Sequence, residues 1–242
     1  MALDAFISDC YLETECSLVQ PIENGRAQII ALFAKTAISP LTSESGRAVT
    51  ESLIVLGIAS ALYDSSTGWP QLRVALAQAL KGDGTTLLSL ADDYAQRRSD
   101  GTYLSNETDA AFVIDCLDWR GPKSTASIKE LAKKFAQEAP VFGPYLAYSG
   151  LSCQFFTTPR QNVMKEIVTT PVIIIGTTRD PATPYVWAQD LHKTIRNSLL
   201  ISFEADGHTG YGHGSNCVDS AVNQYFLTGI LPTSDLTCKS PA

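Results

Sequence analysis

The sequence has few of the features that mark nucleic-acid-binding or membrane-spanning proteins. Its 242 residues include 18 lysines and arginines against 25 aspartates and glutamates, and no basic run is present. Because nucleic-acid affinity depends on clustered lysine and arginine, we expect no nucleic-acid partner. No apolar stretch reaches the roughly 20 residues that cross a bilayer. The first residues also lack the basic and apolar regions of a signal peptide, so we expect neither a membrane span nor an export signal in this chain.

Metal-binding spacings are also missing. The sequence contains no Cys-x-x-Cys pair and no His-x-x-x-His pair, which are common spacings of zinc ligands. Asp180, His208 and His213 are the residues that could form a metal site, which is the alternative to the acid–base role considered below for Asp180 and His208. The two histidines are five residues apart in a glycine-rich loop, and no further ligand stands out. We therefore expect no metal and no cofactor.

Cysteine, in contrast, is present in an even number. The six cysteines are Cys10, Cys16, Cys116, Cys153, Cys217 and Cys238. Their polar, loop-like surroundings favour disulfides, but six cysteines allow 15 pairings and the sequence does not choose among them. Proximity makes Cys10 with Cys16 the easiest closure, and Cys116 with Cys153 and Cys217 with Cys238 are then plausible partners among the remaining pairings; free buried thiols are the alternative. Disulfides would indicate an oxidising compartment, so we expect an extracellular or cell-envelope location.

Residues up to about 150 have a helical pattern. With 45% hydrophobic residues, the chain is long enough to bury a substantial core. Apolar residues recur at spacings of three and four in several segments, which predicts helices there. These segments are 27–34, 49–63, 72–80, 85–97 and 127–138. Glycine and proline predict turns at 65–70 and 82–84.

After about residue 165 the pattern changes. Residues 171–176 form a short β-branched run, typical of a strand buried on both faces of a parallel sheet. A helix at 184–196, a strand at 198–203 and a helix at 217–227 follow. This β-α-β-α order predicts an α/β fold with a right-handed crossover. Two strands leave both sheet edges uncovered, so we expect a homo-oligomer, including a strand-swapped one, or a complex with an upstream half.

A carboxylate and a histidine follow the two predicted strands. Asp180 comes just after the first strand and His208 just after the second. Both therefore fall at the carboxyl edge of the sheet, where open parallel sheets bind their ligands. A carboxylate bonded to histidine fixes the tautomer and stabilises the imidazolium formed when the ring takes a proton from a nucleophile. Taken alone, Asp180 is most simply a turn or helix-cap residue, and His208 is most simply a solvated loop histidine. Their joint placement after two consecutive predicted strands favours a catalytic role.

The nucleophile for such a pair is not found in the sequence. In α/β-hydrolases the chain order is Ser, Asp, His, and the serine lies on a Gly-x-Ser-x-Gly turn. The nearest match is 150–154, where Gln154 replaces the second glycine and would crowd the turn. Ser152 also lies only one strand ahead of Asp180, whereas the fold needs another strand and helix between them. We therefore reject Ser152 and expect the serine upstream of Met1.

Several short motifs resemble those of one enzyme family. Asp-Pro-Ala-Thr-Pro at 180–184 follows an apolar strand, and Gly-His at 207–208 precedes Gly-Tyr-Gly at 210–212. The other motifs are 61–63, 69–70, 82–83, 114–118, Cys153, 217–219, 229–232 and Cys238. Together they resemble the lid and C-terminal region of secreted tripeptidyl aminopeptidases, which belong to the α/β-hydrolases. The resemblance covers nearly the whole chain, but only the downstream half of such an enzyme.

The resemblance implies a fold and an activity. Residues 1–165 would form a helical lid or cap, and residues 166–242 the C-terminal portion of an α/β-hydrolase sheet that is incomplete as a single chain. Asp180 would be the triad acid and His208 the general base, with the three cysteine pairs named above. The implied enzyme is a serine peptidase that releases short peptides from free N-termini. Without the nucleophile and the oxyanion-hole donors, we expect the chain alone to be nearly inactive.

Two readings of the chain stay open. It is either the lid and C-terminal part of such a peptidase or a non-enzymatic module, derived from an α/β-hydrolase, that binds peptides or a partner chain. On the lid, four carboxylates near Cys116 are candidates for binding a substrate's terminal ammonium, although solvated helix carboxylates explain each of them and none is assigned. They are Glu107, Asp109, Asp115 and Asp118. His192 is expected on the surface near a helix C-terminus.

Overall fold

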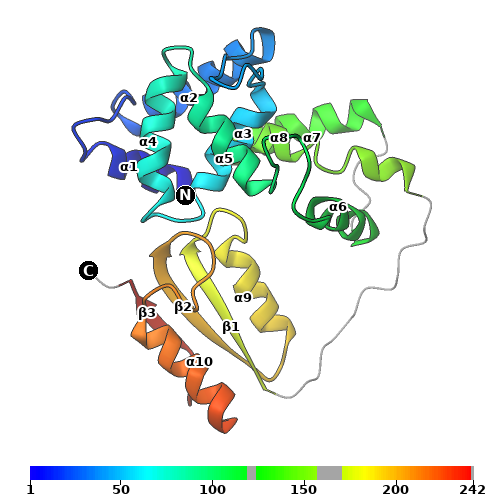
Figure 1. Cartoon of the computed structure of the whole chain (residues 1–242). Helices are drawn as coiled ribbons and strands as arrows, with labels where there is room; N and C mark the ends of the chain where they lie inside the picture. The colour runs from blue at the N-terminus through cyan, green and yellow to red at the C-terminus, as the bar shows by residue number, and fades with distance from the viewer. Residues whose placement is uncertain (119–123, 157–170, 241–242) are drawn as a thin grey trace.

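Helices form the N-terminal part of the computed structural model, and a parallel sheet follows (Figure 1). The structure describes residues 1–118, 124–156 and 171–240. The helices of the first part are α1 (Ala2–Cys10), α2 (Ile22–Ile38), α3 (Glu51–Ala61), α4 (Gly68–Ala79), α5 (Thr85–Tyr94), α6 (Glu107–Asp118), α7 (Thr125–Glu138), α8 (Gly143–Leu146) and the 3₁₀ helix η1 (Ser152–Phe155). The sheet region consists of β1 (Val172–Arg179), α9 (Tyr185–Thr194), β2 (Ser198–Asp206), α10 (Asn216–Thr228) and β3 (Leu236–Lys239). The predicted α/β fold with a mostly helical first part is confirmed.

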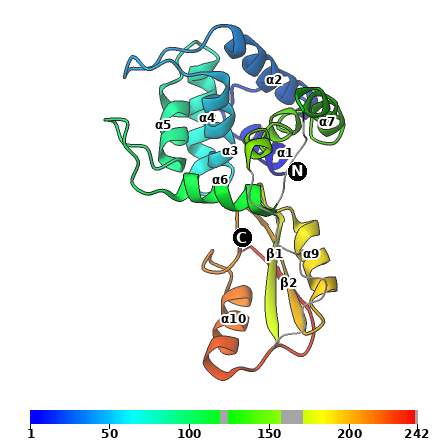
Figure 2. The same cartoon turned by 90° about the vertical axis from the view of Figure 1, so that its right-hand side faces the viewer.

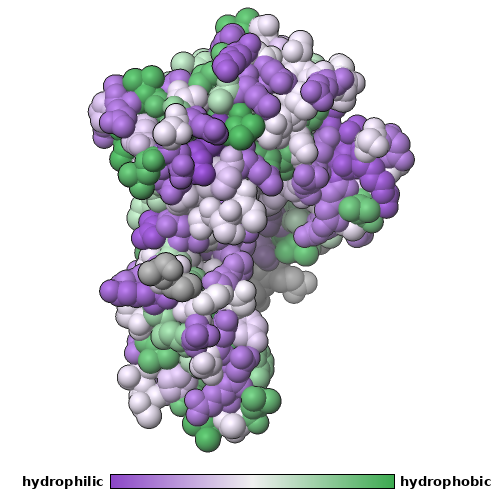
Figure 3. Space-filling model, turned by 60° about the vertical axis from the view of Figure 1, so that its left-hand side comes forward, coloured by the Kyte–Doolittle hydropathy of each residue, from purple (hydrophilic) through white to green (hydrophobic). Residues whose placement is uncertain are grey.

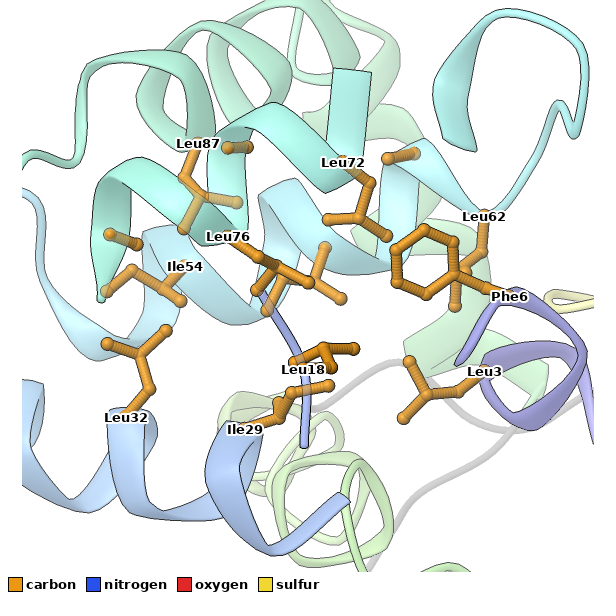
Figure 4. Packing of buried hydrophobic residues seen from close by; sticks show 14 of the residues in the cluster. Leu3, Phe6, Leu18, Ile29, Leu32, Ile54, Leu62, Leu72, Leu76 and Leu87 are labelled. Atoms are coloured by element: carbon orange, nitrogen blue, oxygen red, sulfur yellow. The ribbon is translucent and has the colours of Figure 1, made fainter. Parts of the chain in front are cut away.

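The first part of the chain, α1 to η1, is the helical region, and it contains one large apolar core. Side chains from α1 to α5 converge on it, with Phe6, Ile54 and Leu72 fully buried (Figure 4). On α4 the buried positions include 72, 75, 76 and 79, which repeat at spacings of three and four as one apolar helix face requires. Burying each large apolar side chain contributes roughly 1.5–3 kcal/mol to folding.

The predicted helical segments are present, but one turn boundary is wrong. Residues 65–70 are predicted as a turn, whereas α4 already begins at Gly68 and has Pro70 in its first turn. Proline is tolerated there because the first N–H groups of a helix have no acceptor within the helix. The turn itself ends before Gly68, where the carboxylate of Asp64 accepts hydrogen bonds from the N–H groups of Ser66 and Thr67.

The cysteines are all paired. Cys10–Cys16 joins the last residue of α1 to the segment that follows it, Cys116–Cys153 joins α6 to η1, and Cys217–Cys238 joins α10 to β3. No free cysteine is present, so the pairing implied by the family resemblance is confirmed and the alternative of free thiols is wrong. Each bridge closes a loop and thereby restricts the unfolded chain.

The sheet has helices on both faces (Figure 2). Its order is β1-β2-β3, and both neighbouring pairs are parallel. Side chains alternate along β2, so that Ile201 and Phe203 share a buried cluster with Val222 of α10. Leu200 points to the other face and packs in a cluster with Ala188 of α9. The predicted parallel crossover through α9 is thus present.

Strand β3 extends the sheet beyond the predicted order. The sequence predicts β-α-β-α, whereas the structure continues with a third strand, in which residues 236–239 pair in parallel with 201–204 of β2. The four residues of β3 are too few to show an apolar period, and the buried Cys238 is tied to Cys217. The predicted domain boundary between 165 and 166 lies outside the described residues and stays a prediction.

The surface is mixed in character. On the face in Figure 3, hydrophilic residues cover much of the helical region and hydrophobic residues form small groups. Among the described residues, no helix has both the length and the apolar character needed to cross a membrane. The helical region and the sheet region meet where the backbone carbonyl of Tyr63 accepts a hydrogen bond from the backbone N–H of His208, at 2.8 Å.

Candidate active site

The ends of β1 and β2 are joined by an ion pair. Arg179, the last residue of β1, donates to both carboxylate oxygens of Asp206, the last residue of β2, at 2.5 and 2.8 Å. The strand register shifts just before this pair: Thr177 lies opposite Phe203, but Arg179 lies opposite Asp206. Such irregularities re-aim the residues that follow a strand. The two strand ends are therefore held together at the point where the candidate acid and the loop of the candidate base begin.

Asp180 is held by backbone donors. Its carboxylate accepts hydrogen bonds from the N–H groups of Ala182 and Thr183, both at 2.8 Å, and from Thr209 at 3.2 Å. The hydroxyl of Thr183 adds a fourth contact at 3.0 Å. Proline residues at 181 and 184 restrict the backbone of this turn. The side chain of Asp180 is only 3% exposed, so its orientation is set by these contacts rather than by water.

His208 lies directly against this carboxylate. Its Nδ1 is 3.0 Å from both Oδ1 and Oδ2 of Asp180. An ionised carboxylate has no proton to donate, so Nδ1–H is the donor and Nε2 is the nitrogen with a free lone pair. The His208 side chain is 28% exposed, whereas the Asp180 side chain is almost covered. In this pair the Asp180 carboxylate is therefore covered, whereas the His208 ring is accessible.

The charge of Asp180 is favoured by its partners. Burial raises the pKa of this carboxyl group, but hydrogen bonds from the backbone N–H groups of Thr183, Ala182 and Thr209, and from the His208 ring, outweigh burial. The resulting pKa of Asp180 lies below its ordinary value of 3.8. At neutral pH, Asp180 is thus an anion that can stabilise a positively charged imidazole.

The loop after β2 needs unusual backbone conformations. Gly207 has φ of +105°, and a Cβ atom at this position would lie 2.9 Å from the carbonyl oxygen of Tyr63. Thr209 also has positive φ, at +70°. Its carbonyl accepts a hydrogen bond from the buried Thr177 hydroxyl at 2.8 Å, and its own hydroxyl lies 2.9 Å from Nε2 of His213. These contacts hold the loop in the conformation that puts His208 against Asp180.

An apolar cavity of about 360 Å³ lies beside the pair. It runs between β1, α9 and the loop after β2, and Asp180 and Thr209 are among its lining residues. Trp187 and Leu191 of α9 also line it and remain 59% and 44% exposed. No residue of α9 is fully buried. This cavity lies along β1, whose pairing among the described residues is with β2 alone.

The other residues considered from the sequence lie elsewhere. Ser152 starts η1, and within the described ranges it makes no hydrogen bond to His208. Asp115 and Asp118 line a cavity of about 230 Å³ next to Cys153, and Glu107 accepts a hydrogen bond from Gln96 at 2.6 Å. Asp109 lies in the first turn of α6.

The remaining histidines have structural contacts. His192 is part-buried in the last turn of α9, where its Nδ1 lies 2.8 Å from the hydroxyl of Ser198 and its Nε2 lies 3.3 Å from Asp235. It thus links α9 to β2 and to the segment before β3 rather than lying free on the surface. In the part of the chain that the structure describes, no cluster of three or more histidine, cysteine or acidic side chains is arranged to hold a metal ion.

Sequence reasoning missed the residues that support the pair. Arg179 and Asp206 are opposite charges that each lie three residues past the end of a predicted strand, and this matching position is a signal in the sequence. Tyr63 stands in the sequence only as part of the motif 61–63, and its contact with His208 crosses from the helical region to the sheet region. Chemically, the arrangement provides an oriented imidazole that can accept a proton at Nε2 and a buried carboxylate that stabilises the resulting cation.

Comparison with known proteins gives a consistent result. Residues 139–238 match the family model described as TAP-like protein. The chain is 32% identical to carboxylesterase B of Mycobacterium tuberculosis over 250 residues, which cover 98% of this chain and 46% of that protein. It is 32% identical to the serine protease Hip1 of the same organism over 207 residues, covering 82% and 39%. The tripeptidyl aminopeptidase of Streptomyces lividans is 26% identical over 215 residues, covering 87% and 39%. The chain thus spans less than half the length of these relatives.

Proposed function

Because residues 139–238 of this chain belong to the TAP-like family of α/β-hydrolases, we propose that it supplies the acid and the base of a serine peptidase. Asp180 is the acid, His208 is the base, and the enzyme releases short peptides from free N-termini. The observation that carries this proposal is the pair of 3.0 Å contacts between Nδ1 of His208 and the Asp180 carboxylate. Relatives named as a serine protease and a tripeptidyl aminopeptidase support a peptide substrate, while the name carboxylesterase B keeps esters as the second class to test.

In this proposal the two residues act through proton transfer. Nε2 of His208 takes the proton of a serine hydroxyl as that oxygen attacks the scissile carbonyl. The imidazolium then donates this proton to the leaving amine, and a water molecule releases the acyl group by the same steps. The charge of Asp180 stabilises the imidazolium throughout. Its side chain is 3% exposed, so water screens this charge weakly.

We infer that the nucleophile comes from outside these 242 residues. They contain no Gly-x-Ser-x-Gly motif, and in α/β-hydrolases the serine precedes the acid and the base in the chain. Residues 1–242 alone would then be nearly inactive, because His208 has no serine to activate. An upstream half would add its strands at the edge of β1 that has no partner strand among the described residues, next to the apolar cavity. The alternative is a non-enzymatic module that binds a peptide or a partner chain. Such a module would bind at the same β1 edge and cavity, and it would need no serine.

The three disulfides support an oxidising compartment for this chain. We propose an extracellular or cell-envelope location on this basis. Mass spectrometry of protein alkylated without reduction, taken directly from its native compartment, would test the location. Six unmodified, bridged cysteines are expected, and six alkylated thiols would contradict it.

Labelling with a fluorophosphonate, which reacts with activated serines, tests the catalytic proposal. The coding sequence immediately upstream is examined for Gly-x-Ser-x-Gly, and that upstream half is mixed with this chain. We expect labelling that needs both halves and is lost in His208→Ala but retained in His192→Ala, the matched control. A short peptide with a free N-terminus and an ester of the same acyl group then distinguish the substrate classes.

The contrary outcomes are distinct. Labelling of this chain alone would show that Ser152 or another internal serine is the nucleophile. Absence of labelling from a well-folded complex would favour the binding module. Labelling that survives His208→Ala would remove His208 from the mechanism.

A further inference from the structure

We propose that Tyr63 of the helical region is a positioning residue that holds the His208 imidazole in its working orientation. The proposal rests on the proposed function, in which His208 is the base. It adds a residue from the other region of the chain to the site. Tyr63 and His208 are connected by two separate contacts, one through the backbone and one through the rings.

The backbone contact fixes the main chain at His208. The carbonyl oxygen of Tyr63 accepts a hydrogen bond from the N–H of His208 at 2.8 Å. This carbonyl lies two residues beyond the end of α3, and its position is held on the other side by the Asp64 carboxylate, which binds the N–H groups of residues 66 and 67. Only glycine fits next to it at 207, as described above. The N–H of His208 therefore has a partner at a defined place on the helical region.

The ring contact restrains the imidazole itself. The Tyr63 ring packs edge-to-face against the His208 ring, with centroids 4.8 Å apart and planes at 62°. Tyr63 is in turn held by Tyr94 at the end of α5, through a second edge-to-face contact at 5.5 Å and a hydroxyl–hydroxyl distance of 3.2 Å. Burial, the hydrogen bond to Tyr94 and the charges of Tyr94 and Asp180 raise the pKa of Tyr63, so its ring stays uncharged beside the imidazole.

The three anchors of His208 are complementary. Asp180 binds the ring at Nδ1 alone, and one such contact leaves the imidazole free to rock about that atom. The backbone hydrogen bond fixes the point from which the side chain starts, and the Tyr63 ring, packed edge-to-face against the imidazole, limits the rotation of the His208 ring. Within the described ranges Nε2 makes no hydrogen bond, so its direction depends on these three contacts. Errors of about 1 Å in the placement of a reacting group can cost on the order of 100-fold in rate.

Nuclear magnetic resonance of the histidine rings tests this proposal without any catalytic assay. The chain has three histidines, so ¹³C,¹⁵N-histidine labelling gives a simple spectrum in which His208→Ala assigns the signals of residue 208. In the wild type we expect ring-current shifts of the His208 carbon-bound protons from Tyr63. We also expect a downfield Nδ1–H signal from the hydrogen bond to Asp180.

Substitutions of Tyr63 test whether its ring orients the His208 imidazole or only fills space beside it. Tyr63→Leu should abolish the ring-current shift and broaden the Nδ1–H signal through exchange with water, while Tyr63→Phe, which keeps the ring, should retain both. Tyr103→Leu, at a tyrosine that is 53% exposed, is the matched control and should change neither signal. The His192 signals report whether the fold is intact, because His192 contacts Ser198 and Asp235 outside the loop that carries His208. If Tyr63→Leu disturbs them, Tyr63→Met fills a similar volume without an aromatic ring.

An unchanged His208 spectrum in folded Tyr63→Leu or Tyr63→Met would overturn the proposal, as would loss of both signals in folded Tyr63→Phe. In the complex with the upstream half, Tyr63→Leu should also lower the rate of serine labelling at least about 10-fold. A wild-type complex that is not labelled would refute the proposed function, whereas the ring spectra would still decide the role of Tyr63.

Discussion

At the scale of single residues, Asp180 is a carboxylate stabilised by backbone N–H groups, and its side chain is almost fully covered. Its hydrogen bonds from Ala182, Thr183 and Thr209 favour the ionised form and resist protonation. The same N–H groups would form weaker hydrogen bonds to a neutral amide or to a protonated carboxyl group than to the carboxylate. The charge of Asp180 therefore contributes to folding as well as to the proposed chemistry.

The stabilising effect of Asp180 should depend on pH. Its pKa in the folded protein lies below the ordinary value of 3.8, so the stabilisation is fully present above that pH and is lost as the pH falls through the lower folded value. At neutral pH, Asp180→Asn should lower the free energy of unfolding by about 1–3 kcal/mol, because buried donors lose a charged acceptor. Urea unfolding of both proteins at neutral pH and at several pH values below 3.8 measures this.

Asp190→Asn is the control for that series, since the Asp190 side chain is 62% exposed. It should have little effect at any pH. The interpretation would be contradicted if the difference between wild type and Asp180→Asn stayed constant, or grew, as the pH fell.

At the scale of elements, the Arg179–Asp206 ion pair ties two strand ends that otherwise meet at an irregular register. Its geometry is bidentate, and its members are 40% and 23% exposed. A partly exposed pair of this kind is expected to contribute about 1 kcal/mol. Its larger effect would be on the distance between Asp180 and the loop that carries His208.

A double-mutant cycle on Arg179→Ala and Asp206→Ala tests this clamp. We expect a coupling free energy of about 1 kcal/mol from urea unfolding. The pair Lys193–Asp190 on α9 is the matched control, because its side chains are 72% and 62% exposed, and it should couple by about 0.5 kcal/mol or less. Equal coupling in the two cycles would mean that the bidentate pair is an ordinary surface contact.

The elements differ in how far the sequence predicts them. Long periodic segments such as 49–63 give helices at the expected places, and the β-branched run at 171–176 gives β1. Strand β3 has only four residues and depends on pairing with β2 and on the Cys217–Cys238 bridge, neither of which has a local signal. The positions of Asp180 and His208 after two strands can be predicted from the order of elements in the chain. The hydrogen bond from His208 to Tyr63 cannot, because its acceptor is a backbone carbonyl, which every residue has.

At the scale of the whole molecule, the part of the sheet that the structure describes has one covered edge and one open edge. β3 covers the outer edge of β2, while β1 pairs only with β2 among the described residues. On α9, which has no buried residue, Val186, Trp187 and Leu191 are 51%, 59% and 44% exposed, and the last two line the cavity along β1. An open strand edge next to exposed apolar side chains favours association with another chain.

We therefore expect the chain alone to self-associate at micromolar concentration, and to exchange this contact for the upstream half when it is present. Trp187→Lys should weaken self-association at least about 10-fold, since it puts a charge into an apolar contact. Phe226→Lys is the control, because Phe226 is 77% exposed on α10, which covers the opposite face of the sheet. Light scattering over a concentration series measures the effect, and a stable wild-type monomer would refute the expectation.

The positions of the disulfides have a consequence for how the two regions are joined. Cys10–Cys16 and Cys116–Cys153 close within the helical region, and Cys217–Cys238 closes within the sheet region. No bridge crosses between the regions, since all six cysteines are used in these pairs. Cleavage of one peptide bond between 157 and 170 would therefore yield two separate polypeptides, each with its own bridges. A proteolytic cut there could divide the candidate base from the tyrosine that holds it without reducing any disulfide.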